Sequence, residues 1–102
     1  MKLSGYSQCY RKEAGQGKDA KGIYRLHQFS KVEMFAFTEE AQSSKMLNEI
    51  IKIQIELCEK LGFHFRVIEL PTEELGASAY RKFDLEMWLP SKNSFCEVYS
   101  MY

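Results

Sequence analysis

Residues 39–61 carry an apolar stripe with the 3.6-residue period of an α-helix, and the rest of the chain must supply the surface that covers this stripe. We expect Thr38 to cap the helix and Gly62 to end it. Glu39 and Glu40 then lie at the positive end of the helix dipole. The stripe consists of Met46, Leu47, Ile50, Ile51, Leu57, Cys58 and Leu61.

The segments on either side of this helix have the patterns of β-strands. Residues 63–70 are aromatic and β-branched and end at Pro71, and residues 83–89 alternate apolar with polar side chains. Strands that follow one another without an intervening helix favour an antiparallel sheet, so we predict an α+β fold with an antiparallel sheet and a long packing helix. A chain of 102 residues holds one domain. We expect a hairpin at about 6–38, the helix at about 39–61 and further strands at about 63–101 within a single domain over 1–102.

Composition excludes several classes of protein. No apolar run approaches the roughly 20 residues that cross a membrane, so we expect no membrane partner. Cys9, Cys58 and Cys96 are odd in number and form no CxxC pair, which predicts free thiols rather than a zinc site or disulfides. Residues 1–31 hold seven basic and two acidic side chains, a net charge of +5. This charge suits an anionic ligand such as a nucleotide or RNA, although solvated lysines would give the same pattern.

The predicted hairpin separates polar from apolar side chains by strand alternation. Its even positions on the second strand are mostly apolar and are expected to pack on the helix. Its odd positions combine arginines and carboxylates with an aromatic ring, which are the groups that bind phosphates, an ammonium group and a base. A simply solvated face remains an alternative at this point. The odd positions are Arg11, Glu13, Arg25, His27, Phe29, Lys31 and Glu33.

Four segments of the chain resemble one known enzyme family. YRKE at 10–13 and GIYRLHQFSKVE at 22–33, on either side of a glycine-rich loop, closely resemble motif 2 of class II aminoacyl-tRNA synthetases in its seryl form. The similarity continues through LPTEELG at 70–76 and KFDLEMWLP at 82–90. The stretch from Leu61 to Pro90 is most similar to the animal mitochondrial form. The resemblance implies a serine-tRNA ligase, which activates serine with ATP and passes the seryl group to tRNA(Ser).

This resemblance implies a role for each matching residue. Arg11 corresponds to the catalytic arginine on the α-phosphate of ATP, and Arg25 to a second catalytic arginine that reaches the γ-phosphate. Glu13 corresponds to a glutamate in the region of ATP and the tRNA acceptor end. Phe29 corresponds to the ring that stacks on adenine, and Glu33 to the carboxylate that receives the serine ammonium group. Positioning and electrostatics would then carry the reaction, because the serine carboxylate is already ionised.

The resemblance also implies a magnesium site near the C-terminal end. Glu97 and Ser100 correspond to the residues that ligate Mg²⁺ beside the phosphates of ATP, and oxygen ligands suit this ion. Positions 97 and 100 face opposite sides of a regular strand. The assignment therefore requires a β-bulge or a turn between them.

The family pattern is incomplete at both ends of the sequence. We find no motif 1, which forms the homodimer of the complete enzyme, no motif 3 with its adenine-clamping arginine, and no tRNA-binding arm. We therefore expect residues 1–102 to be a partial catalytic domain that is inactive alone. Resemblance favours a mitochondrial location, although the first residues show no transit peptide, and the cytoplasm is the alternative. Two other hypotheses stay open: an inactive synthetase-like module that binds nucleotide, tRNA or a synthetase subunit, and a small α+β protein with a solvated face.

Overall fold

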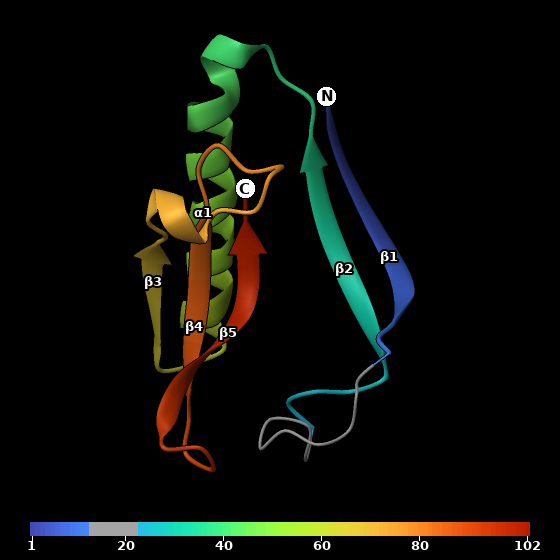
Figure 1. The fold of residues 1–102 in the computed structure, drawn as a ribbon, viewed down its shortest axis with the longest axis vertical. Coiled ribbons are helices and arrows are strands. Elements are labelled where there is room, and N and C mark those ends of the chain that lie inside the picture. Colours follow the sequence, from blue (N-terminus) through green and yellow to red (C-terminus); the bar gives the residue numbers. More distant parts are fainter. Residues whose placement is uncertain (13–22) are drawn as a thin grey trace. The chain divides into compact units, whose positions relative to one another are not determined.

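The computed structural model describes residues 1–12 and 23–102. Contacts between residues divide the chain into two units, Met1–Phe37 and Thr38–Tyr102, which are described separately below. Figure 1 labels their helices and strands along the sequence. Every strand pair in the described residues is antiparallel, so the predicted α+β class with antiparallel pairing is confirmed.

The first unit is a β-hairpin. Strand β1 (Lys2–Tyr10) pairs with β2 (Gln28–Ala36) in a continuous register without a bulge. Pairing starts at Lys2, four positions before the predicted start of the hairpin. Backbone hydrogen bonds extend the ladder beyond both ends: the Arg11 N–H donates to the carbonyl of His27 at 2.8 Å, and the Phe37 N–H donates to the carbonyl of Met1 at 2.8 Å.

The helix of the second unit begins later than the sequence predicts. A 3₁₀ turn, η2 (Glu40–Gln42), precedes the α-helix α1 (Ser43–Lys60). Thr38 is therefore not the N-cap. Glu39 is still extended, with φ −70° and ψ 154°, so the first helical turn forms after it. No side chain caps either helix start.

The C-terminal end of α1 follows the prediction. Gly62 adopts φ +71°, the left-handed conformation that glycine reaches without steric cost. Its N–H donates to the carbonyl of Glu59 at 3.0 Å, and the Phe63 N–H donates to the carbonyl of Cys58 at 3.1 Å. These two hydrogen bonds form a Schellman motif, which satisfies the last carbonyls of the helix.

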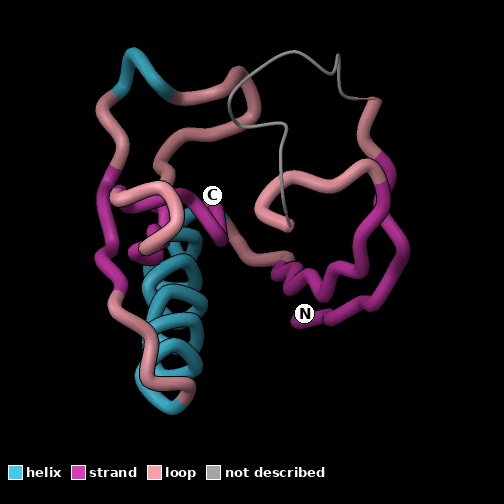
Figure 2. The backbone as a smooth tube through the Cα atoms, turned by 90° about the horizontal axis from the view of Figure 1, so that it is seen from below, coloured by secondary structure: helices cyan, strands magenta, loops and turns pink. Residues whose placement is uncertain are grey.

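A three-stranded sheet makes up the rest of the second unit. Its strands are β3 (Phe65–Glu69), β4 (Phe83–Leu89) and β5 (Ser94–Met101), arranged in the order β3-β4-β5. A short 3₁₀ turn, η3 (Thr72–Glu74), lies on the connection between β3 and β4. The strand expected at 83–89 has these bounds, the strand expected at 63–70 is shorter, and β5 lies within the range of about 63–101 in which further strands are expected. Figure 2 shows these strands in magenta and α1 in cyan.

The core of the second unit lies between α1 and one face of this sheet. Leu85 is completely buried and Cys58 is 1% exposed. The predicted stripe is only partly used, because Leu57 and Leu61 remain 44% and 56% exposed. Within the described residues, no helix combines the length and the apolar character needed to cross a membrane. The buried cluster consists of Leu47, Ile51, Cys58, Leu85 and Met101.

Candidate functional site

Within strands β1 and β2, the odd-numbered side chains share one face, as predicted. Residues directly opposite each other in an antiparallel pair point to the same side of the sheet. The unbroken register of β1 and β2 therefore fixes which side chains are neighbours on this face. We call it the charged face of the hairpin; it consists of Phe29, Lys31 and Glu33, with Cys9, Ser7 and Gly5 opposite them respectively, and of Arg11, which follows β1 and lies over the Phe29 ring.

A planar cation and an aromatic ring lie together at one end of the charged face. The guanidinium carbon of Arg11 is 5.0 Å from the centroid of the Phe29 ring, a cation–π distance. The ring can stack on a base, and the guanidinium offers a fork of donors for a phosphate. The main chain supports this arrangement, because the Arg11 N–H is bonded to His27 directly before β2.

A carboxylate occupies the other end of the charged face. Glu33 Oε1 is 2.6 Å from the Nζ of Lys31, and both side chains are 43% exposed. The hydrogen bond from Lys31 to Glu33 raises the pKa of the Lys31 ammonium above its usual value. Ion pairs at such exposure typically contribute about 0 to 1 kcal/mol, so Glu33 can exchange its partner at little cost.

The predicted site residue Arg25 does not lie on a strand. Arg25 falls in the turn before β2, which begins at Gln28, so the prediction that Arg25 belongs to the strand alternation is wrong. Turn backbone at Ile23–Arg25 replaces the extended conformation there, and alternation assigns no face to this arginine. Glu13 lies outside the described residues.

A β-bulge in the second unit brings Glu97 and Ser100 to one face. On β4, Leu85 pairs with Tyr99 while its neighbour Glu86 pairs with Glu97, so Val98 is an extra residue on β5. The Ser100 hydroxyl consequently lies 2.9 Å from Glu97 Oε1. The bulge that the metal assignment requires is therefore present.

Asp84 belongs to the same group, although no local sequence pattern marks it as a site residue. Ser100 Oγ donates to Asp84 Oδ1 at 2.7 Å, and the Nζ of Lys82 is 3.4 Å from the same oxygen. Asp84 is 6% exposed and is the one buried polar or charged residue among those described. Local alternation gives Asp84 the same polar pattern as Glu86 on this strand, and its partners depend on strand register.

The oxygen atoms of this group suit a hard divalent cation. Asp84 and Glu97 supply carboxylates and Ser100 supplies a hydroxyl, which are ligand types that Mg²⁺ accepts. In the part of the chain that the structure describes, however, no group of three or more His, Cys, Asp or Glu side chains is arranged to hold a metal. The residues thus fit an ion that also keeps water or phosphate ligands.

An arginine near the group of Asp84, Glu97 and Ser100 lowers the net negative charge of this part of the sheet. Arg66 Nε is 2.6 Å from Glu86 Oε2, and the Arg66 guanidinium lies 4.4 Å from the Phe95 ring centroid. Glu86 is the cross-strand neighbour of Glu97. The arginine therefore offsets one of the carboxylates that lie near Glu97.

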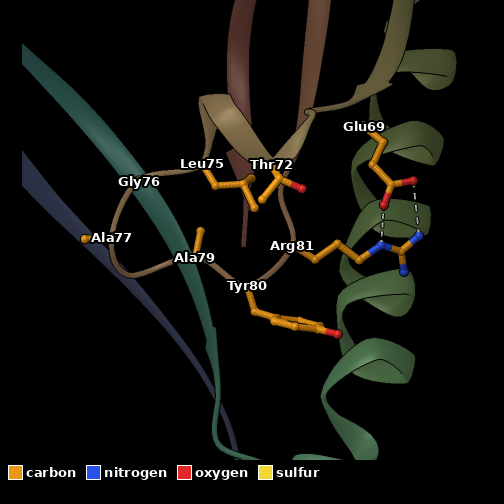
Figure 3. Close-up of a pocket in the computed structure, with 8 residues that line it drawn as sticks. All are labelled: Glu69, Thr72, Leu75, Gly76, Ala77, Ala79, Tyr80 and Arg81. Carbon is orange, nitrogen blue, oxygen red and sulfur yellow. Dashed lines mark hydrogen bonds and ion pairs between the residues drawn. The ribbon is translucent and has the colours of Figure 1, made fainter.

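A shallow hollow lies beyond the end of β3, and Figure 3 shows the side chains that line it. Glu69 accepts two hydrogen bonds from Arg81, at 2.5 and 3.3 Å. These bonds lower the pKa of Glu69 below its usual value. The hollow contains none of the predicted site residues; its lining is Glu69, Thr72, Leu75, Gly76, Ala77, Ala79, Tyr80 and Arg81.

Comparisons with known proteins identify close relatives of the chain. The serine–tRNA ligase of mouse mitochondria is 50% identical over 96 residues, which is 92% of this chain and 18% of the relative. The mitochondrial enzyme of Schizosaccharomyces pombe is 48% identical over 97% of this chain and 21% of its own length. A bacterial serine–tRNA ligase, from Tropheryma whipplei, is nearly as similar, at 46% identity over 98% of this chain and 24% of the relative. Similar proteins thus occur both in mitochondria and in bacteria.

A solved structure and a family description agree with these relatives. The crystal structure of seryl-tRNA synthetase from Pyrococcus horikoshii complexed with ATP matches with a TM-score of 0.90 and 42% identity, over 98% of this chain and 23% of that one. The chain spans about a fifth of the length of these relatives. Residues 1–101 match the tRNA synthetase class II core domain (G, H, P, S and T). The chain therefore belongs to the class II tRNA synthetase core family and corresponds to part of the catalytic core of seryl-tRNA synthetases.

Proposed function

We propose that this chain supplies the ATP- and serine-binding strands of a serine-tRNA ligase. One observation carries the proposal: Phe29 and Glu33 lie on a single face of a hairpin whose register has no break, and the Arg11 guanidinium lies over the Phe29 ring. That face offers a phosphate-binding cation, a ring for a base and a carboxylate for an ammonium group. The solved relative that contains ATP supports the nucleotide part of the assignment.

The phosphate groups of ATP are assigned to two arginines. Arg11 binds the α-phosphate and neutralises the charge that develops when the serine carboxylate attacks it. Arg25 reaches the γ-phosphate from the turn before β2. Glu13 contributes to the region where ATP meets the tRNA acceptor end. No general base is required, since the attacking carboxylate is already ionised.

The other two contacts orient the substrates. Phe29 stacks on adenine. Glu33 receives the serine ammonium group, and its 2.6 Å contact with the Lys31 ammonium supports this role, because that ammonium forms the same type of bond. Holding both substrates in this way converts a reaction between two molecules into one within a complex.

Magnesium is assigned to the oxygen atoms on β5. Glu97 and Ser100 would hold Mg²⁺, and Asp84 keeps the Ser100 hydroxyl in place through the 2.7 Å hydrogen bond. When bound, the ion would neutralise charge on the phosphate groups of ATP. Glu97 thereby also contributes to ATP binding.

The complete enzyme of this proposal acts on tRNA(Ser) as a homodimer. Mitochondrial relatives of mouse and cattle at 50% and 51% identity favour a mitochondrial location over a cytoplasmic one. The inactive, ligand-binding module is the competing proposal for the chain alone. Binding and catalysis therefore need separate measurements.

Catalysis is tested in a chimera in which residues 1–102 replace the matching segment of the mouse mitochondrial enzyme. We expect serine-dependent exchange of pyrophosphate into ATP, and Arg11→Ala should slow it by about two to three orders of magnitude, as expected for loss of one donor to the transition state. Lys45→Ala, on the exposed start of α1, is the control. An exchange rate that does not change in Arg11→Ala would contradict the role of Arg11.

Binding is tested with the unmodified chain and a sulfamoyl analogue of seryl-adenylate, by calorimetry. The proposal predicts saturable binding that Phe29→Ala and Glu33→Gln each weaken. An inactive chimera together with intact binding would favour the ligand-binding module. Absence of saturable binding would refute the proposed function.

A further inference from the structure

Gly5 is a glycine inside β1 for which the described residues show no structural reason. Glycine in a strand interior costs conformational entropy and offers no side chain to pack. It usually marks a positive φ, a bulge or a close approach of another group. The explanation for Gly5 therefore has to come from one of these three.

The described structure excludes the first two explanations. Gly5 is not among the residues with positive φ, and the pairing of β1 with β2 continues through it without a shift. No described atom approaches closely either, because a Cβ added at Gly5 would meet nothing within 4 Å. Alanine or a larger residue is thus compatible with the hairpin itself.

The open space at Gly5 lies next to a carboxylate. Gly5 is directly opposite Glu33, so a side chain at position 5 would project from the same face at a Cβ–Cβ distance of about 5 Å. Lys31 already contacts Oε1 of Glu33 on its own strand. The cross-strand side of Glu33 is consequently the side that glycine keeps open.

We propose that Gly5 determines specificity by keeping open a subsite for the primary ammonium group of an amino acid, between its own backbone and the Glu33 carboxylate. This inference rests on the proposed function and adds a residue to it. Lys31 bounds the subsite along β2, and the absent side chain at position 5 gives the ligand its access. A side chain at position 5 would occupy the volume that the ammonium group and its α-carbon need.

The test separates ligand binding from stability. Gly5→Ala and Gly5→Val are titrated with the sulfamoyl analogue of seryl-adenylate and, separately, with AMP. The analogue should bind about five-fold more weakly to Gly5→Ala and up to about a hundred-fold more weakly to Gly5→Val, since overfilling a packed site has costs of this size. AMP should bind both variants as it binds the wild type. The thermal midpoint should stay unchanged or rise by about 2 to 8 °C, because replacing glycine restricts the unfolded chain.

Ser4→Val is the matched control, because position 4 lies on the opposite face of the same strand, across from Met34. It should leave the binding of both ligands unchanged. Equal affinity of wild type and Gly5→Val for the analogue would overturn the subsite and leave the proposed function intact. A fall in thermal midpoint with equal loss of both ligands would show a structural role instead and also overturn it. A wild-type chain that binds neither ligand would overturn the proposed function and the subsite together.

Discussion

Replacing Ser100 by alanine should destabilise the second unit through the carboxylate that it leaves behind. The Ser100 hydroxyl donates to Asp84 at 2.7 Å, and Asp84 is 6% exposed. A hydrogen bond to a charged group contributes about 1.5 to 3 kcal/mol, and removing one partner leaves the desolvation cost of the other. Lys82 at 3.4 Å still offsets part of the charge. We therefore expect a loss of about 2 kcal/mol in the free energy of unfolding.

Urea denaturation monitored by the fluorescence of Trp88 measures this loss. At a slope of about 1 to 2 kcal/mol per molar urea, the midpoint should fall by about 1 to 2 M. The measurement is made with a chelator present, so that no divalent ion contributes. Ser94→Ala is the control on the same strand, because among the described residues its hydroxyl bonds only to the weakly polar sulfur of Cys96, at 3.6 Å.

The expected difference between the two variants is the informative quantity. Ser94→Ala should stay within about 0.5 kcal/mol of wild type. If Ser100→Ala is also within about 0.5 kcal/mol, the hydroxyl does not compensate the buried carboxylate, and the arrangement of the site on β4 and β5 is wrong. An equal loss of unfolding free energy in both variants would instead indicate that β5 is destabilised by substitution in general.

Two further properties follow from single contacts. The pKa of Glu69 should lie below its ordinary value near 4.5, because Arg81 donates hydrogen bonds to the ionised carboxylate. The pair therefore stabilises the fold above pH 4.5. This contribution is lost as the pH falls through the lowered pKa. An NMR titration in which Arg81→Met leaves the pKa of Glu69 unchanged would contradict this cause. Gly62→Ala should cost about 1 to 2 kcal/mol, since φ is +71° there, whereas Gly76→Ala, without a positive φ, should change the urea midpoint little. Equal effects of the two substitutions would refute the role of the left-handed residue.

Local patterns in the sequence predict the elements of this fold well. The apolar period locates α1, and the alternation on β4 correctly places Leu85 in the buried cluster, although the neighbouring Asp84 is buried as well. The same reasoning fails at the ends of elements. Thr38 has a side chain that can cap a helix, but the backbone is still extended at Glu39. Where a helix begins depends on contacts with the rest of the fold, and a local sequence pattern does not contain this information.

Strand alternation in the sequence predicts which side chains of the candidate site share a face. The register that brings residues of different strands together cannot be predicted from a local pattern. Phe29 and Glu33 share a face because strands alternate, and the register confirms this prediction; Arg11 follows β1 and joins them through its contact with the Phe29 ring. Arg25 was placed wrongly because the turn extends to it before β2 begins. Asp84 was missed since its relation to Ser100 arises from the pairing of β4 with β5, sixteen residues apart in sequence.

The charged face of the hairpin is the central element of the proposed function, and residue-resolved NMR tests it most directly. The sulfamoyl analogue of seryl-adenylate is added to the isotope-labelled chain, and the backbone and side-chain signals are followed. The account predicts that the largest shifts, with saturation, fall on Arg11, Phe29, Lys31 and Glu33. No shifts at these residues, or shifts gathered instead around Arg81 and the hollow of Figure 3, would contradict it.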